Sequence, residues 1–202
     1  VGSTTAKLVA VDENDNLLFS KYERHNAKAK ETILSFLKEL LSEIGDKDIS
    51  VRITGSIGMG ISEKCSLPFV QEVVAAAKAI QKDYSHVTSM IDIGGEDAKV
   101  VFFNDAEATD LRMNGNCAGG TGAFIDQMAT LLNTDPMGLN ELAKGYQTLY
   151  PIAARCGVFA KTDVQPLINE GAAKEDIAAS IFQSVVNQTI SGLACGRPIR
   201  GN

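Results

Sequence analysis

Residues 1–10 read V-G-S-T-T-A-K-L-V-A, and residues 93–102 read I-G-G-E-D-A-K-V-V-F. Gly2 aligns with Gly94, and the alanine and lysine that follow each turn align as well. In both copies a turn of small residues leads into a β-forming segment, which presents several backbone N–H groups to phosphate oxygens without a side chain in the way. The repeat predicts a phosphate clamp built by duplication, and a chance match of two hairpins is the alternative.

The composition bounds the class of protein. With 202 residues, 45% of them hydrophobic and 22% charged, the chain can bury the core of one large domain or two small ones. A net charge of -6, without a cluster of basic and aromatic residues, argues against a nucleic-acid surface. No apolar run approaches the roughly 20 residues of a membrane span, and no signal peptide is visible. We therefore expect a cytoplasmic protein without nucleic-acid or membrane partners.

The remaining periodicity predicts an alternating α/β chain in which the order of the first unit is replayed. We expect a first domain at residues 1–86 and a second at 87–202. The first is expected to hold strands at 7–11, 17–22 and 51–54, helices at 27–45 and 69–81, and a glycine-rich loop at 55–62. The second is expected to hold strands at 89–93, 99–103 and 108–113, followed by helices at 119–132, 138–144, 158–169 and 174–192.

Polar residues beside the glycines supply the candidate chemistry. Asp92 ends a predicted strand just before Gly94, where a carboxylate can hold hydrated Mg²⁺ while the glycine backbone binds phosphate; a turn cap is the alternative. Glu96 and Asp97 are further candidates for the hydrolytic residue, and each is also compatible with a solvated turn. Neither a P-loop nor a Rossmann fingerprint occurs. The residues predicted to bind the nucleotide are Gly2, Ser3, Thr4, Thr5, Lys7, Gly94, Gly95, Lys99, Gly119, Gly120 and Thr121.

Two of the four cysteines, Cys117 and Cys156, each stand just before a predicted helix. Unpaired N–H groups and the helix dipole at such a position lower the pKa of a thiol, which favours a nucleophile or a metal ligand. Four thiolates usually hold a cubane iron–sulfur cluster, and two per chain suffice if two chains meet across a symmetry axis. For either cysteine alone, a buried small hydrophobe is the alternative. Cys65 and Cys195 are expected to be structural or incidental.

Four motifs together resemble the BadF/BadG/BcrA/BcrD ATPase family, the ATP-dependent activators of 2-hydroxyacyl-CoA dehydratases and benzoyl-CoA reductases. They are V-G-S-T-T-A-K, D-I-G-G-E-D-A-K, M-N-G-N-C-A-G-G-T-G-A-F and R-C-G-V-F-A-K-T-D-V. The resemblance implies the fold of the actin, Hsp70 and sugar-kinase superfamily, with two ribonuclease-H-like domains hinged over a nucleotide. It also implies a homodimer with one 4Fe-4S cluster held between the subunits by Cys117 and Cys156 of each chain.

The same resemblance implies the reaction. ATP and Mg²⁺ bind, hydrolysis moves the domains, and one electron passes from reduced ferredoxin or flavodoxin through the cluster to a dehydratase or reductase under anaerobic conditions. Asp92 and Glu96 are the residues assigned to hydrolysis, and Asp92 also to Mg²⁺. The acyl-CoA that the partner acts on is not implied.

The sequence departs from the family pattern at three places. The pattern has an acidic residue before the first glycine, and it continues past residue 202 into a turn that contacts adenosine. Both lie outside this sequence, so we expect a fragment with an incomplete second domain and weak ATP binding. Lys161 stands where many relatives carry an acidic residue, which indicates a divergent branch.

Two other functions remain open. One is a sugar or small-molecule kinase of the same superfamily, which needs a catalytic Asp close to a substrate hydroxyl; residues 55–62 show no clear sugar site. The other is a non-catalytic module of a larger activase protein that kept the fold and lost turnover.

Overall fold

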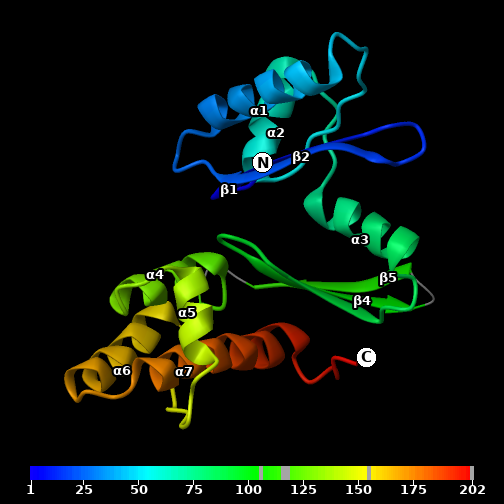
Figure 1. The fold of residues 1–202 in the computed structure, drawn as a ribbon. Coiled ribbons are helices and arrows are strands. Elements are labelled where there is room, and N and C mark those ends of the chain that lie inside the picture. The colour runs from blue at the N-terminus through cyan, green and yellow to red at the C-terminus, as the bar shows by residue number, and fades with distance from the viewer. Residues whose placement is uncertain (105–106, 115–118, 154–155, 201–202) are drawn as a thin grey trace. The chain divides into compact units, whose positions relative to one another are not determined.

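Figure 1 shows the computed structural model of the chain, which describes residues 1–104, 107–114, 119–153 and 156–200. The described residues divide into two compact units, Val1–Ala79 and Ile80–Asn202, and each unit has its own antiparallel sheet. Helix α3 (Glu72–Asp83) runs across this division. The predicted domain boundary between residues 86 and 87 remains a prediction.

The sheet of unit 1 is a hairpin of β1 (Thr5–Val11) and β2 (Leu17–Arg24), as predicted. The Asp12 carboxylate closes the connection, because its Oδ1 accepts hydrogen bonds from the backbone amides of Asn14 and Asn16, each at 2.8 Å. An aspartate that bonds to the amides ahead of it favours a turn over a longer strand. The hairpin therefore follows from local chemistry that the sequence displays.

Helix α1 (Ala29–Ile44) packs against this hairpin through Phe36 and Leu40, which are 1% and 4% exposed. Its apolar residues recur at intervals of three and four, so they lie on one face of the helix. Gly45 ends the helix with φ of 72°, a conformation that costs glycine little. The predicted helix at 27–45 is thus confirmed, with its start moved to residue 29.

The predicted loop at 55–62 is wrong, because these residues begin helix α2 (Ser56–Cys65). Glycine inside a helix costs about 1 kcal/mol relative to alanine, and the packing of Gly58 offsets that cost. A Cβ on Gly58 would lie 3.2 Å from Cγ1 of Ile53, so only glycine lets the helix approach so closely. Tertiary packing overrides the local signal here.

The predicted strand at 51–54 is reduced to one parallel bridge between Ile53 and Phe69. The amide of Ile53 donates to the carbonyl of Pro68, and the amide of Val70 donates to the carbonyl of Ile53. Phe69 is therefore extended, which is why α3 begins at residue 72 and not at the predicted residue 69.

The sheet of unit 2 has the order β3-β4-β5 and is antiparallel throughout. Its strands are β3 (Ser89–Ile93), β4 (Ala98–Asn104) and β5 (Glu107–Met113), which confirms the three predicted strands. The central strand β4 is buried from Ala98 to Phe103 on both faces, because neighbouring strands and packed segments cover it. Residues 94–97 join β3 to β4 in a short hairpin turn.

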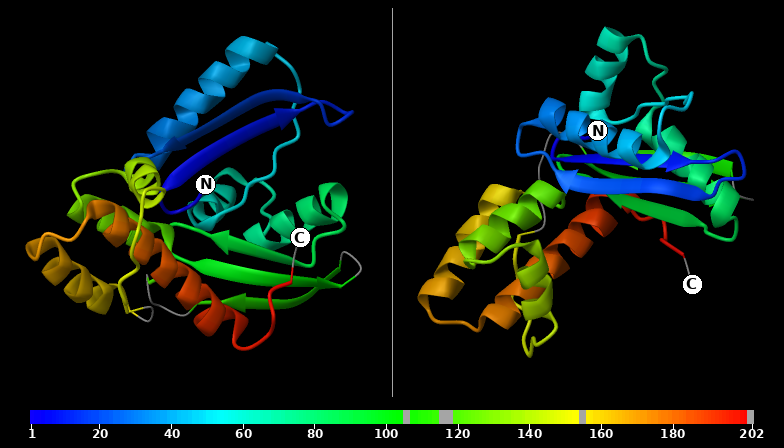
Figure 2. Two further views of the ribbon diagram at one scale, coloured as in Figure 1. Left: turned by 60° about the horizontal axis from the view of Figure 1, so that its bottom comes forward. Right: turned by 45° about the horizontal axis from the view of Figure 1, so that its top comes forward.

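Four helices follow the sheet and bury a common core. Figure 2 shows α7 running from the other helices toward the sheet, where the π-helix η1 (Thr189–Ala194) contacts β4 and β5. The predicted helix at 174–192 is therefore α-helical only to residue 188. The helices are α4 (Gly122–Leu131), α5 (Pro136–Ala143), α6 (Gly157–Asn169) and α7 (Lys174–Gln188), and their core includes Phe124, Met128, Leu139, Val164, Ile177 and Ile181.

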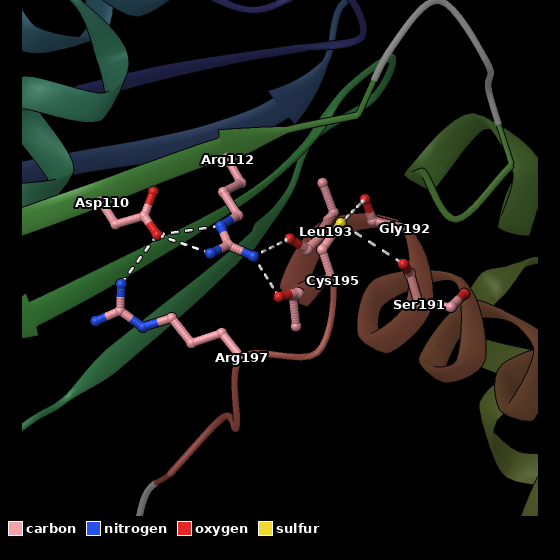
Figure 3. A network of polar contacts seen from close by, with 8 residues as sticks. Asp110, Arg112, Ser191, Gly192, Leu193, Cys195 and Arg197 are labelled. Carbon is pink, nitrogen blue, oxygen red and sulfur yellow. Dashed lines mark hydrogen bonds and ion pairs between the residues drawn. The ribbon is translucent and has the colours of Figure 1, made fainter.

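A charged network fastens η1 to the sheet of unit 2 (Figure 3). The Asp110 carboxylate lies 3.0 Å from Arg112 and 2.9 Å from Arg197, and Arg112 also donates to the carbonyls of Leu193 and Ala194. Hydrogen bonds from Arg112, which has the larger effect, and from Arg197 hold the pKa of Asp110 below its usual range. The end of the π-helix is thereby tied to β5.

Within the described residues, no helix combines the length and apolar character needed to cross a bilayer.

Candidate functional site

The two glycine turns have the same backbone geometry. In turn 1 (residues 2–5) the amide of Gly2 donates to the carbonyl of Thr5 at 3.0 Å. In turn 2 (residues 94–97) the amide of Gly94 donates to the carbonyl of Asp97 at 2.8 Å. The alanine that follows each turn is buried, with exposed fractions of 0% and 3%. The two copies of the sequence repeat therefore share the hydrogen bond that closes the turn and the buried alanine that follows it.

The carbonyls of turn 2 are held by the first amides of α4. The amide of Gly122 donates to the carbonyl of Gly94 at 2.8 Å, and the amide of Ala123 donates to the carbonyl of Gly95 at 2.9 Å. A Cβ on Gly122 would lie 3.0 Å from the Gly94 carbonyl oxygen, so glycine permits this contact. Two of the donors that a helix start leaves unpaired are thus used to fix the turn.

Two carbonyls of turn 1 are held by one residue, His25. Its backbone amide donates to the carbonyl of Thr4 at 3.2 Å, and its Nε2 lies 3.1 Å from the carbonyl oxygen of Gly2. The side chain is buried, with 4% exposed. With the bond from Gly2 to Thr5, three carbonyls of turn 1 accept hydrogen bonds from within unit 1.

The two turns also carry backbone amides that take no part in these hydrogen bonds. Within the described part of the chain, the amides of Ser3, Thr4, Gly95 and Glu96 donate to no backbone carbonyl. A concavity that offers N–H groups, with its carbonyl oxygens turned away, attracts anions such as phosphate. Three of the four carbonyls of each turn accept hydrogen bonds from within their own unit, an arrangement that suits phosphate binding. Phosphate binding by the turns remains a prediction.

The lysines that follow the turns differ in their surroundings. Lys99 has a side chain only 6% exposed, and its Nζ lies 2.8 Å from Oδ2 of Asp97 and 3.8 Å from Oδ2 of Asp92. Lys7, at the equivalent place, is exposed, and its Nζ lies 5.0 Å from the centre of the Tyr22 ring. The ammonium of Lys99 is thus engaged by carboxylates of its own hairpin. Contact of either lysine with a nucleotide remains a prediction.

Asp92 and the exposed Glu96 suit the chemistry predicted for them. Asp92 lies on β3 next to turn 2 with 32% of its side chain exposed. Mg²⁺ in nucleotide sites usually takes one or two carboxylates and completes its octahedron with water and phosphate oxygens, so this carboxylate fits such a site. Within the described ranges, no three His, Cys, Asp or Glu side chains gather as a metal cage. Mg²⁺ binding by Asp92 remains a prediction.

Gly119, Gly120 and Thr121 are buried at the start of α4. Gly120 has φ of 81°, and a Cβ there would lie 2.9 Å from Cγ of Gln188. Thr121 has an exposed fraction of 0% and therefore presents no surface to a ligand in this conformation. These residues bring the chain into α4 beneath turn 2, and their direct contact with a nucleotide remains a prediction.

Of the two predicted cluster ligands, Cys117 lies outside the described residues. Cys156 is the N-cap of α6 and is partly exposed, as its sequence context predicts. A Cβ on the next residue, Gly157, would lie 3.3 Å from Cδ2 of Phe124, which is in the first turn of α4. The starts of α4 and α6 thus lie together. Helix α4 begins at residue 122 and not at the predicted residue 119, so Cys117 stands five residues before it in the sequence and not directly before it. The role of the two cysteines as cluster ligands remains a prediction. Cys65 and Cys195 are exposed.

Comparison with protein families supplies the deciding observation: the profile of the BadF/BadG/BcrA/BcrD ATPase family matches residues 1–194. The chain belongs to the BadF/BadG/BcrA/BcrD ATPase family. A curated relative is the (R)-2-hydroxyglutaryl-CoA dehydratase activating ATPase of Acidaminococcus fermentans. It is 29% identical over 196 residues, which are 96% of this chain and 75% of the relative.

Two solved structures resemble this chain to different degrees. The activator of 2-hydroxyisocaproyl-CoA dehydratase from Clostridium difficile, with bound ADPNP, matches with a TM-score of 0.87 and 28% identity. The match covers 100% of this chain and 75% of that one. A putative 2-dehydro-3-deoxygalactonokinase from Sinorhizobium meliloti shares the fold alone, with a TM-score of 0.52 and 14% identity over 97% of this chain and 80% of that one. The predicted α/β fold of the actin, Hsp70 and sugar-kinase superfamily is confirmed.

Sequence reasoning identified both turns but missed the groups that support them. Gly122 stands in the G-G-T-G run, so a glycine forced by close backbone contact could have been suspected there. His25 has no such signal, because its position after β2 does not show that the ring lies beneath turn 1. Only the folded hairpin brings residues 2 and 25 together.

Proposed function

We propose that this chain is an ATP-hydrolysing iron–sulfur activator that transfers an electron to a 2-hydroxyacyl-CoA dehydratase or a related CoA-ester reductase. The observation that carries the proposal is the polarity of the two turns: three of the four carbonyls of each turn accept hydrogen bonds from within their own unit, and among the described residues four turn amides donate to no backbone carbonyl. Membership of an ATPase family supports it, as does the likeness to a dehydratase activator with bound ADPNP.

The ATP-dependent part of the proposal uses residues of both turns. The amides of Ser3, Thr4, Gly95 and Glu96 bind phosphate oxygens, where the donors are already oriented before the ligand arrives. Asp92 would hold Mg²⁺, which when bound would supply positive charge beside the phosphates as the terminal one is transferred to water. Glu96, exposed in turn 2, orients that water.

The redox part of the proposal uses the two cysteines before α4 and α6. Cys117 and Cys156 hold half of a 4Fe-4S cluster, and a second copy of the chain supplies the other two thiolates across a two-fold axis. The cluster supplies one-electron chemistry. Reduced ferredoxin or flavodoxin is the proposed donor, and the dehydratase or reductase is the proposed acceptor.

Anaerobic purification with iron analysis tests the redox part. We expect a brown protein with about four irons per two chains. Cys156→Ser should lose most of the iron, because a hydroxyl is a poor ligand for this cluster. Cys65→Ser is the matched control, since Cys65 is an exposed cysteine in unit 1, and it should keep the iron.

Three results would contradict the proposal in different ways. A colourless protein that phosphorylates a sugar or other small molecule from ATP would establish the kinase alternative. Four irons per single chain would refute the shared cluster and would bring Cys65 and Cys195 back as ligands. ATP binding without any hydrolysis would leave a non-catalytic module.

A further inference from the structure

One carbonyl oxygen of turn 1, that of Gly2, contacts a side chain that the proposed mechanism does not use. His25 donates its backbone amide to Thr4 at 3.2 Å, and its ring Nε2 lies 3.1 Å from the carbonyl oxygen of Gly2. A carbonyl oxygen can only accept, so Nε2 carries the proton in this contact. The imidazole thus orients the peptide group between Gly2 and Ser3.

The backbone around His25 is held in a rare conformation. Asn26 and Ala27 have φ of 47° and 62°, and the amide of Lys28 donates to the carbonyl of His25 at 2.7 Å. A left-handed conformation costs a residue with a Cβ about 1 kcal/mol or more. Strain of this kind persists where the surrounding structure requires it, and it often marks a functional position. Here the strained turn follows directly on the residue whose ring lies beneath turn 1.

The second ring nitrogen shows that burial alone does not explain this histidine. The Nδ1 of His25 is buried, and within the described residues it has no hydrogen-bond partner. A buried polar atom without a partner costs about 1–3 kcal/mol, whereas an apolar side chain of similar size has no such cost. An apolar ring would avoid the cost of burying Nδ1. The contact that an apolar ring could not make is the one between Nε2 and the carbonyl oxygen of Gly2.

We propose that His25 is a positioning residue of turn 1, whose ring fixes the Gly2 carbonyl while its backbone amide holds the Thr4 carbonyl, so that the amides of Ser3 and Thr4 face phosphate. In turn 2 the same task is performed by the amides of Gly122 and Ala123 at the start of α4. The inference rests on the proposed function, because it takes turn 1 to be a phosphate-binding turn.

Two substitutions test whether the side-chain N–H donor of His25 supports turn 1. In His25→Gln the side-chain nitrogen lies as many bonds from Cβ as Nε2 does, so it can reach the Gly2 carbonyl. In His25→Asn the same group is one bond shorter and falls short. We expect the Asn variant to bind Mg²⁺–ADPNP about tenfold more weakly, and the Gln variant to stay within about threefold of the unaltered chain, by calorimetry below both melting temperatures.

Equal affinity in the Asn variant, or an equal loss in the Gln variant, would overturn the role of His25 while leaving the proposed function intact. Absence of ADPNP binding by the unaltered chain would instead overturn the proposed function together with this inference.

A second measurement needs no substitution and therefore does not depend on whether a variant folds. Nitrogen-15 NMR of the unaltered chain should show His25 protonated at Nε2 and not at Nδ1, with ring signals that shift when ADPNP binds. The only other histidine, His86, is exposed and should not respond. A ring of His25 protonated only at Nδ1 would refute the inference, because Nε2 could not then donate.

Discussion

Turn 1 and turn 2 both close with a hydrogen bond from a glycine amide to the carbonyl three residues on, but they are supported differently. The carbonyls of turn 1 rest on the amide and ring of His25, whereas those of turn 2 rest on the first amides of α4. The repeat therefore preserves the surface that faces a ligand and not the groups behind it. A side-chain support can be removed by one substitution, while a helix start is part of a packed core.

The largest expected effect comes from pushing α4 away from turn 2. In Gly122→Val the new Cβ would lie 3.0 Å from the Gly94 carbonyl oxygen, and its two methyl groups need further room. Overpacking of this kind costs about 3 kcal/mol. We expect the free energy of unfolding to fall by about this amount in urea titrations, together with a loss of ADPNP affinity.

Gly60→Ala is the matched control for this substitution. Gly60 also lies in a helix, α2, but a Cβ there would meet nothing within 4 Å. The change should stabilise the chain by up to about 1 kcal/mol, because alanine favours the helix interior. If Gly122→Val is tolerated as well as Gly60→Ala, the contact between α4 and turn 2 does not support the turn.

The next effect separates the two lysines that follow the turns. Lys99→Met leaves the carboxylates of Asp92 and Asp97 without their shared ammonium, and charged hydrogen bonds of this kind contribute about 2 kcal/mol. Lys7→Met removes an exposed charge that only faces the Tyr22 ring, so its effect should stay within about 0.5 kcal/mol. Thermal or urea unfolding of both variants measures the difference. Equal changes in the free energy of unfolding would show that the buried ion pairs of Lys99 contribute nothing to stability.

The smallest effect concerns one carboxylate in each unit, Asp12 in the β1–β2 connection and Asp110 on β5. Hydrogen bonds from Asn16, its side chain first, and from Asn14 hold the pKa of Asp12 below its usual range, as Arg112 and Arg197 do for Asp110. A lowered folded pKa stabilises the chain above the unfolded value of about 3.9, and this contribution is lost as the pH falls through the folded pKa.

Melting temperatures of Asp12→Asn and Asp110→Asn check this prediction. Each variant should melt below the unaltered chain at neutral pH, and the gap should close in acid below about pH 3. At about 1 M salt, where the Debye length is about 3 Å, the gap should narrow for Asp110, which has cationic partners, more than for Asp12. A gap that persists unchanged in acid would contradict the lowered pKa values.

The parts of the fold that the sequence predicts are those fixed by local chemistry. The β1–β2 hairpin follows from turn formers such as Asp12, and α1 follows from apolar spacing that Gly45 ends. Helix α2 was missed because close contact between Gly58 and Ile53 decides it, and a glycine-rich stretch by itself favours a loop. The end of α7 at residue 188 was missed, because the switch to the π-helix η1 depends on the contacts of η1 with the sheet.

The candidate site divides in the same way. The turns, Asp92 and the position of Cys156 before a helix can be predicted from residue type and spacing. The ion pair of Lys99 and the ring of His25 cannot, because each depends on which side chains the hairpins bring together. The groups that touch a ligand leave a pattern in the sequence, whereas the groups that hold them do not.

Phosphate binding by both turns can be measured by titrating the isotope-labelled chain with Mg²⁺–ADPNP and following its backbone amide signals by NMR. We expect the amides of Ser3, Thr4, Gly95 and Glu96 to shift together at one affinity, while those of Gly122 and Ala123, already bonded to turn 2, respond less. If none of the first four amides shifts, or if only one turn responds, the claim that both turns bind phosphate is contradicted.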